Sequence, residues 1–249
     1  MRVLVISDLH ANLQATEAVL ADASRHGWES ALVLGDLVGY GADPAAVIDA
    51  VRDLAGATVI RGNHDKVVAG IDNASDFNFV ARQAAEWTID ALDDDRAAYL
   101  RALPRGPVTI STLGLDLAIC HGAPFDEDYY LFDADDAGRA FETSEAALVF
   151  CGHTHVQIAF RQTAAGGARA LADLDAGMVE VGSNVRTLVN PGSVGQPRDG
   201  DPRAAYGILD TAGGVVHLHR VAYDIGEAQR RIIDAGLHAS LAERLLVGR

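Results

Sequence analysis

The sequence of 249 residues contains a single lysine, Lys66, and only two cysteines, Cys120 and Cys151. Two cysteines are too few for a disulfide framework, and each lies at the end of an apolar run, where a small buried thiol is common. No stretch reaches the roughly 20 uninterrupted apolar residues that a membrane-spanning helix requires. The first apolar run is too short for a signal peptide and lacks a cleavage site, so we expect a soluble, cytoplasmic protein.

Positive charge is scarce throughout the chain. The formal net charge is −15, and such a surface repels the phosphate backbone of nucleic acids. A basic, arm-like extension is also missing, so we do not expect nucleic acid as a partner. Most of the acidic residues would form a solvated surface, and some of them could attract metal cations.

Runs rich in valine, isoleucine and leucine alternate with helical patterns over the first two-thirds of the chain. The alternation predicts a layered α/β architecture, and the runs are apolar on both faces, as in strands covered on two sides. The predicted strands occupy residues 2–7, 31–35, 58–62, 115–120 and 147–152.

The helical patterns carry recognisable start signals. A helix is expected over 44–54, with Asp43 as its cap and Pro44 in its first turn, and a longer helical region over 79–103 stops at Pro104. The acidic run at 93–95 also reads as a helix start, because carboxylates favour the N-terminal end of the helix dipole.

The rhythm changes at about residue 156. Short strands separated by glycine-rich breaks predict hairpins of a second, partly antiparallel sheet, and an amphipathic helical segment follows at 226–247. We find no linker, repeat or low-complexity stretch, so residues 1–249 are predicted to form a single domain.

Each of the five predicted strands is followed by polar residues of the kind that bind metals, with glycine beside most of them. The endings are DLH at 8–10, GD at 35–36, GNHD at 62–65, HG at 121–122 and GHTH at 152–155. Ligands of open α/β sheets bind beyond the carboxyl ends of the strands. One such ending alone is more often a turn or a cap, but five together indicate a metal or catalytic site.

The residue types narrow the choice of metal. Imidazole and carboxylate without thiolate suit manganese, iron, zinc, cobalt or nickel rather than a structural zinc bound by cysteine. Seven ligands are too many for one tetrahedral ion, whereas two ions that share a bridging carboxylate would use them all.

The ordered set D-x-H, GD, GNH[DE], H and GHxH resembles the pattern of the calcineurin-like metallophosphoesterase superfamily, and in particular its small prokaryotic branch of phosphodiesterases and phosphatases. The resemblance implies a four-layer α/β/β/α sandwich of two facing mixed sheets flanked by helices. It also implies two divalent or trivalent metal ions. One would be held by Asp8, His10, Asp36 and His155 and the other by Asp36, Asn63, His121 and His153, with Asp36 as the bridge.

The same resemblance implies an activity. A metal-bridging hydroxide would hydrolyse a small phosphodiester, phosphomonoester or nucleotide. His64 would not be a metal ligand but would protonate the departing oxygen or stabilise the phosphoryl group. Some proteins of this fold have lost their ligands and act as scaffolds; that reading is weaker here, because every predicted ligand and His64 are present.

One motif departs from part of the family. Ser/Thr protein phosphatases and dinucleoside tetraphosphatases continue the second motif as GD-x-V-x-R-G, whereas this chain reads GDLVGYG. Tyr40 stands where the phosphate-clamping arginine is expected, and Gly39 stands where protein phosphatases place an aspartate. The clamp is therefore missing at its usual place, and these two activities are kept as the alternative.

Two residues are candidates for contact with the substrate, and each has an ordinary alternative. Tyr40 would stack on a base or sugar, or simply pack against the helix that starts near residue 44. Arg198 lies with Arg203 in the loop 190–206; it would replace the missing clamp, or be a surface arginine like most others.

Four further histidines are not expected at the site. His217 and His219 alternate within a strand and are predicted on the solvent face of a hairpin. His26 and His238 lie in helical contexts without acidic or glycine neighbours and are predicted at the surface.

Overall fold

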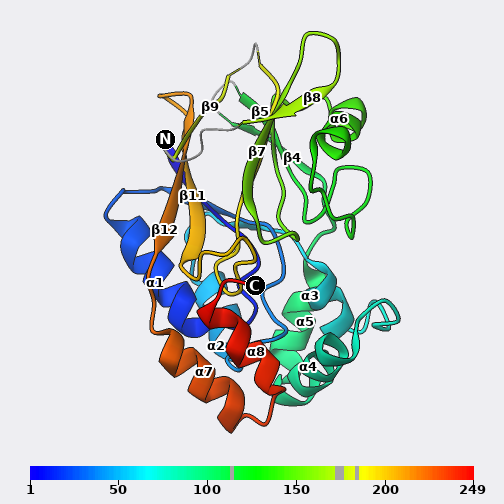
Figure 1. Ribbon diagram of the computed structural model, residues 1–249, viewed down its shortest axis with the longest axis vertical. Helices are drawn as coiled ribbons and strands as arrows, with labels where there is room; N and C mark the ends of the chain where they lie inside the picture. Colours follow the sequence, from blue (N-terminus) through cyan, green and yellow to red (C-terminus); the bar gives the residue numbers. More distant parts are fainter. Residues whose placement is uncertain (113–114, 172–176, 183–184) are drawn as a thin grey trace.

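The computed structural model describes residues 1–112, 115–171, 177–182 and 185–249. Its described strands form two six-stranded sheets (Figure 1). Sheet A has the order β3 (Thr58–Val59), β2 (Ser30–Val33), β1 (Arg2–Ile6), β11 (Ala204–Asp210), β12 (Val215–Val221) and β9 (Met178–Glu180). Sheet B has the order β4 (Val108–Thr112), β5 (Leu115–Ile119), β6 (Leu148–Phe150), β10 (Thr187–Pro191), β7 (Gln157–Gln162) and β8 (Ala168–Ala170).

Both sheets mix parallel and antiparallel pairs. In sheet A, β1 pairs in parallel with β2 and antiparallel with β11. In sheet B, β6 pairs in parallel with β5 and β10, and β7 pairs antiparallel with β10. The predicted pair of mixed sheets flanked by helices is therefore confirmed.

The helices lie on the outer faces of the sheets. They are α1 (Leu13–Ser24), α2 (Pro44–Arg52), α3 (Asn63–Val68), α4 (Phe79–Ala91), α5 (Asp94–Ala102), α6 (Ala134–Thr143), α7 (Ile225–Asp234) and α8 (Ala239–Glu243), and a 3₁₀ turn follows at Arg244–Leu246. Figure 1 shows α6 beside sheet B and the other helices gathered at the opposite end of the molecule. Within the described ranges, none of them has the length and apolarity to cross a bilayer.

Alternation along β1 explains the layers. Val3 and Val5 belong to the apolar cluster shared by the two sheets, together with Leu148 of β6. Leu4 and Ile6 belong instead to the cluster under the helices. Successive side chains of a strand point to opposite faces, so one strand built from apolar residues can serve both layers.

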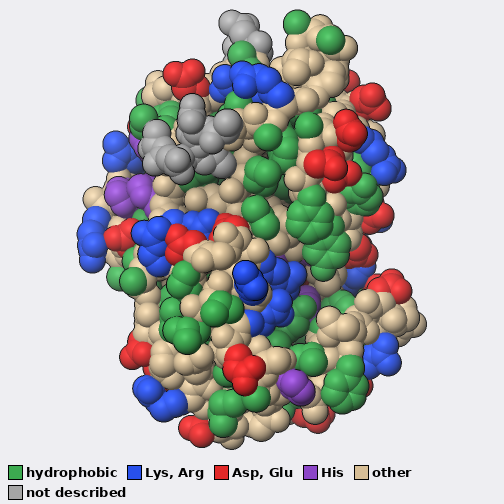
Figure 2. All heavy atoms as spheres, in the orientation of Figure 1, with side chains coloured by type: hydrophobic (Ala, Val, Ile, Leu, Met, Phe, Trp, Pro, Cys, Tyr) green, Lys and Arg blue, Asp and Glu red, His purple; other side chains and the backbone are tan. Residues whose placement is uncertain are grey.

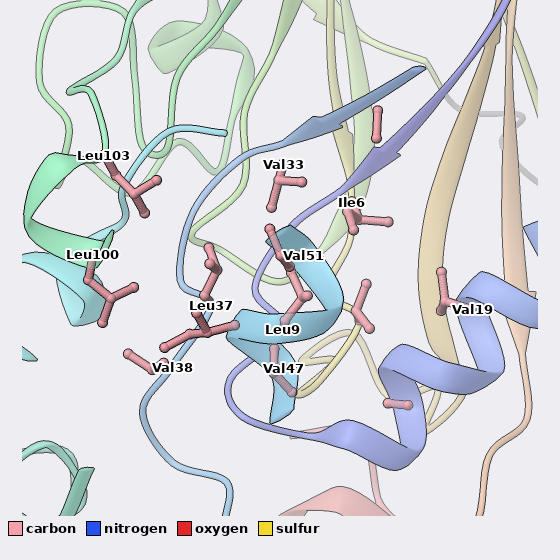
Figure 3. Close-up of a cluster of buried hydrophobic side chains, with 14 of the residues drawn as sticks. Ile6, Leu9, Val19, Val33, Leu37, Val38, Val47, Val51, Leu100 and Leu103 are labelled. Atoms are coloured by element: carbon pink, nitrogen blue, oxygen red, sulfur yellow. The ribbon is translucent and has the colours of Figure 1, made fainter. Parts of the chain in front are cut away.

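Helix α2 packs against the loops that follow β1 and β2. Figure 3 shows Val47 and Val51 of this helix in one buried cluster with Leu9 and Leu37. Leu9 lies between Asp8 and His10, and Leu37 follows Asp36. All four apolar side chains are at most 1% exposed, and burial of each stabilises the fold by roughly 1.5–3 kcal/mol. The polar loops are therefore anchored by the apolar residues within them.

The assignment of strands to sheets differs from the simplest expectation. The five predicted strands do not share one sheet, because β1, β2 and β3 lie in sheet A whereas β5 and β6 lie in sheet B. The later strands are likewise divided, since β10 inserts beside β6 and β11 beside β1. Hydrogen-bond pairing between distant segments decided this, and the local patterns carried no information about it.

Two predicted helical regions are broken in the structure. The region 79–103 forms α4 and α5, and the Asp93 side chain accepts a hydrogen bond from the Arg96 amide to start the second helix. The segment 226–247 forms α7, α8 and the 3₁₀ turn, with Gly236 at φ 73° between the helices. Asp43 occupies the predicted cap position of α2, but its carboxylate binds the Arg231 guanidinium instead of the helix amides.

Candidate metal centre

The polar endings of the predicted strands meet at one end of the sandwich. Their ligand atoms form two buried groups in which all atoms lie within 4.8 Å of one another: Asp8, His10, Asp36 and His155 in the first, and Asp36, His121 and His153 in the second. Asp36 belongs to both. The structure thus brings together six of the seven predicted ligands as possible metal-binding groups, and the carboxylate predicted as the bridge lies between them.

The seventh predicted ligand, Asn63, begins α3. Its side chain is half-buried, and its Oδ1 lies 3.2 Å from Nε2 of His121. Asn63 therefore lies against the second group, where an amide oxygen could complete a coordination shell.

The histidine rings are oriented by backbone carbonyls. Nδ1 of His10 donates to the Val38 carbonyl at 3.1 Å, and Nδ1 of His155 donates to the Gln196 carbonyl at 2.6 Å. A carbonyl oxygen only accepts, so in a neutral ring Nε2 is left with a bare lone pair. The two Nε2 atoms nevertheless face each other at 3.1 Å. Two lone pairs at this distance repel, and a cation between them removes the conflict.

The second group has the same arrangement. Nδ1 of His121 donates to the Leu34 carbonyl at 2.8 Å, and Nε2 of His153 donates to the Asp128 carbonyl at 3.0 Å. The opposite nitrogen of each ring is thereby left for the group around Asp36. Such outer hydrogen bonds are the usual way in which a protein fixes the tautomer and orientation of metal-binding histidines.

Asp36 carries an unsatisfied oxygen. Its Oδ1 accepts a hydrogen bond from the His64 amide at 2.8 Å, but its buried Oδ2 has no hydrogen-bond partner within the described part of the chain. Oδ2 lies 3.5 Å from Nε2 of His10 and 3.4 Å from Nε2 of His121. An unpaired buried carboxylate oxygen is costly, and its position between the two groups fits a shared cation site.

The histidines of the cluster differ in the direction in which their pKa values are shifted. Burial lowers the pKa values of His10 and His155 well below the usual range, which keeps both rings neutral and able to bind a metal. Burial alone would also lower the pKa of His121, but the carboxylates of Asp36 and Asp8 raise it to about 10.

The backbone at the ligands is held in an uncommon conformation. Asp8, His10, Asp36, His153 and His155 have φ between 46° and 66°, the left-handed region that residues with a Cβ seldom adopt. Such conformations cost about 1–3 kcal/mol each and concentrate at functional sites. These five positions therefore lower the stability of the fold, and in return the backbone directs the candidate ligand side chains toward one another.

Asp65, the last residue of the GNHD motif, ties the two central loops together. Its carboxylate accepts hydrogen bonds from the amides of Leu37 at 2.9 Å, Val38 at 3.3 Å and Gly62 at 2.9 Å. Burial, reinforced by the charge of Asp36, raises the pKa of Asp65 to about 7. We assigned no role to this residue from the sequence, although its place in the motif was the available signal.

His64 lies at the rim of the first group and is buried. Its ring centroid is 5.0 Å from that of His10, 4.4 Å from Tyr40 and 4.5 Å from Phe77. Burial lowers the pKa of His64 to about 4. Its Nδ1 has no hydrogen-bond partner in the residues that the structure describes, and a Cβ at position 39 would lie 2.3 Å from that atom. Gly39 therefore lets the His64 ring lie directly against the backbone, and a carboxylate side chain at position 39 would clash with it.

Tyr40 is more enclosed than a base-stacking residue would be. It is 9% exposed and packs with Ala81, Ala84 and Leu241, from α4 and α8. The ring thus packs against α4 and α8 rather than against α2, and contact with a substrate stays a prediction. Burial raises the pKa of Tyr40, so the phenol stays protonated.

Arg198 is half-buried rather than an ordinary surface arginine. Its amide donates to the His155 carbonyl at 3.2 Å, and its Nη2 donates to Oε1 of Gln196 at 2.9 Å. Nε is buried and lacks a partner among the described residues. Arg203, in contrast, is exposed and paired with Asp201 at 2.6 Å.

A cavity of about 120 Å³ opens on the second group. Asn63 and His153 line it together with Lys66, Phe77 and Tyr130, among other residues. The Tyr130 ring stacks on His153 with centroids 3.8 Å apart, and Tyr130 itself is 44% exposed. Tyr130 was not among the predicted site residues, because an aromatic residue in an irregular loop carries no pattern that points to a site.

The remaining histidines lie away from both groups. His219 stacks on Tyr206, with centroids 4.9 Å apart, and lies tilted against His26 at 4.3 Å; both histidines are half-buried. His217 and His219 are therefore not on an open solvent face, because α1 covers that side of β12. His238 is exposed and caps α8 through its Nδ1, which accepts from the Ser240 amide at 3.2 Å.

Comparison with known proteins places this geometry in a family. The model of the calcineurin-like phosphoesterase superfamily domain matches residues 1–214. The chain is 35% identical over 249 residues to an uncharacterized protein of Methanocaldococcus jannaschii, and the match covers 99% of this chain and 98% of that protein.

Two solved structures share the whole fold. A metallophosphoesterase from Sphaerobacter thermophilus is 39% identical, with a TM-score of 0.85 and coverage of 100% of this chain and 99% of that one. A hypothetical protein from Pyrococcus horikoshii is 20% identical, with a TM-score of 0.80 and coverage of 100% and 98%. The match to the family model agrees with the two facing sheets and with the position of Asp36 in both groups of ligand atoms. The chain belongs to the calcineurin-like phosphoesterase superfamily.

Proposed function

We propose that this protein is a dinuclear metal-dependent phosphoesterase that hydrolyses a small phosphodiester, phosphomonoester or nucleotide. The observation that carries the proposal is the carboxylate of Asp36, whose unpaired Oδ2 lies between two buried groups of ligand atoms. Asp8, His10, Asp36 and His155 would hold one ion, and Asp36, Asn63, His121 and His153 the other. Manganese, iron, zinc, cobalt and nickel all suit these ligands.

Bound cations of this kind supply an activated water and neutralise charge that develops on the phosphoryl oxygens. The protein contributes the rest. The His64 ring, neutral and held beside His10, would donate a hydrogen bond to the departing oxygen or to the phosphoryl group. Arg198, whose buried Nε lacks a partner among the described residues, would bind a phosphoryl oxygen with its charge.

The alternative activities fit the site less well. A protein phosphatase would need the carboxylate that orients the catalytic histidine, and here Gly39 and an unpartnered Nδ1 of His64 stand in its place. A tetraphosphatase of the symmetrical type would need the arginine that Tyr40 replaces. A purely structural role would not require five ligand residues in the left-handed conformation.

The experiment that tests the proposal is metal analysis of the purified protein, followed by a substrate panel with Mn²⁺ added. The panel includes p-nitrophenyl phosphate, bis-p-nitrophenyl phosphate, a bis-nucleoside tetraphosphate and a phosphopeptide. We expect about two ions per chain and hydrolysis of the small esters. The Asp36→Asn variant should lose both the ions and the activity. A wild-type protein that binds metal and hydrolyses none of the panel would contradict the proposal.

A further inference from the structure

The C-terminal segment reaches the candidate metal centre, although it lies beyond residues 1–214 that match the family model. The helix α8 and the 3₁₀ turn pack on Tyr40 through Leu241 and Leu245. The turn also carries Arg244, whose guanidinium carbon lies 5.9 Å from the centre of the Tyr40 ring. The guanidinium carbon of Arg198 lies 5.8 Å from the same ring centre. Two arginines from distant parts of the chain therefore meet at one tyrosine.

Neither arginine pairs with an aspartate or glutamate among the described residues, in a chain that contains 35 of them. Arg198 donates to the neutral Gln196, and its Nε has no partner in the same residues. Arg244 donates from its Nε to the main-chain oxygen of Arg249, and its two terminal nitrogens have no hydrogen-bond partner among the residues that the structure describes. Burial, and then the repulsion of Arg198, lowers the pKa of Arg244. Like charges in a half-buried site are stabilised by a bound anion.

Space for such an anion is available next to Tyr40. A depression of about 500 Å³ is lined by Tyr40, Phe79, Leu241 and Arg244, among others, whereas neither Arg198 nor any predicted metal ligand lines it. Figure 2 shows basic side chains gathered in the middle of this face, over the region where Figure 1 places the C-terminal end. A group bound here would therefore be distinct from a phosphoryl group at the metal centre, yet adjacent to it through Tyr40 and His10, whose ring centroids are 4.7 Å apart.

We propose that Arg244, which shares Tyr40 with Arg198, binds a second phosphate group of the substrate in this depression, so that the preferred substrates are small molecules with two phosphate groups rather than simple monoesters. The inference rests on the proposed function, because it assumes that the first phosphate lies at the metal ions. Guanidinium groups bind phosphate through paired, charge-assisted hydrogen bonds. The C-terminal segment 225–249 would then be a specificity element of the site.

The test is calorimetric titration of the manganese-loaded full chain with pyrophosphate and with orthophosphate. The wild type should bind pyrophosphate more tightly. Arg244→Gln should weaken pyrophosphate binding about tenfold or more, as expected for loss of a hydrogen bond to a charged group, and weaken orthophosphate binding less than about threefold. Arg244→Lys keeps the charge and should recover part of the pyrophosphate affinity.

Arg230→Gln is the matched control, because Arg230 lies in the same C-terminal segment, is exposed and pairs with Glu227. It removes the same charge and should leave both affinities unchanged. Because pyrophosphate chelates manganese equally in the titrations of both variants, this control also corrects for chelation. Equal weakening of both ligands in Arg244→Gln, or no weakening of either, would overturn the inference. If Arg244→Gln weakens pyrophosphate binding selectively but the wild-type protein hydrolyses no ester, the proposed function is refuted and the second phosphate site is retained.

Discussion

Nε2 of His10 and Nε2 of His155 face each other at 3.1 Å, while Nδ1 of each ring donates to a backbone carbonyl. Burial keeps both rings neutral by lowering their pKa values. The fold therefore holds two lone pairs against each other, and a cation bound between them would remove their repulsion.

Metal binding should accordingly stabilise the protein. Addition of Mn²⁺ to protein treated with a chelator should raise the melting temperature, because a ligand at 100 times its Kd stabilises the native state by about 2.7 kcal/mol. His155→Gln should lose most of this rise, whereas His219→Gln, which changes a half-buried histidine outside both groups, should keep it. Thermal unfolding of each variant with and without Mn²⁺ measures this rise in melting temperature. Equal rises in the two variants would show that the metal binds elsewhere.

His64 should be needed for turnover but not for metal binding. His64→Asn removes a group that donates to the departing oxygen, so kcat should fall about 10²–10⁴-fold. The metal content should stay at the wild-type value, because His64 contributes no ligand atom to either group. Steady-state kinetics and metal analysis on the same preparation check this. Unchanged kcat with intact metal content would remove His64 from the mechanism.

A glycine at position 39 should be required to keep the His64 ring in its observed position. A Cβ at this residue would lie 2.3 Å from Nδ1 of His64, and the backbone has φ 87°. Gly39→Ala should displace the ring and lower kcat/KM at least tenfold, with a loss of stability of about 1–3 kcal/mol. Gly27→Ala is the control, since Gly27 has φ 66° and nothing within 4 Å of a new Cβ. It should lose stability without losing activity, and equal kinetic effects in both variants would speak against a clash with His64.

Arg198 should contribute to substrate binding. Arg198→Ala removes a charge beside the His155 loop, and loss of a charge-assisted hydrogen bond should lower kcat/KM about 10–100-fold. Arg203→Ala removes an exposed arginine of the same loop that is paired with Asp201, and it should leave the kinetics unchanged. If KM and kcat of Arg198→Ala match those of the wild type, Arg198 does not touch the substrate.

The core between the sheets should dominate stability. Phe150 is fully buried in the cluster that joins sheet A to sheet B, so Phe150→Ala should lower the free energy of unfolding by about 3–5 kcal/mol. Phe132 is 55% exposed, and Phe132→Ala should change it by no more than about 0.5 kcal/mol. Urea denaturation with a linear extrapolation measures both. A loss below about 1 kcal/mol in Phe150→Ala would mean that the core repacks around the change.

Much of the candidate site could be predicted because its information is local. Each ligand lies in a short motif directly after an apolar strand, and the carboxyl end of a strand is where a bound group is expected. Asp8, Asp36 and His153 were therefore recognisable without coordinates, and their spacing matched a known family. The helix start at Asp93 was equally visible, because a capping carboxylate acts on amides only a few residues away.

Other features depended on segments that are far apart in the chain. Three examples are the division of the strands between two sheets, the enclosure of Tyr40 by α4 and α8, and the pairing of Asp43 with Arg231. The last two residues are more than 100 positions apart in the sequence. Arg244 belongs to the same class, since nothing near residue 244 in the sequence indicates that its side chain reaches Tyr40.

The amino-acid sequence by itself determined the candidate ligand residues, the position of each at a strand end and the family, because turn chemistry and hydrophobic alternation act over a few residues. Only the tertiary structure decided which oxygen of Asp36 is left unpaired, which side chains surround His64 and which arginines share Tyr40. These depend on the simultaneous packing of both sheets and the C-terminal helices, and no single segment encodes the geometry that several of them create together.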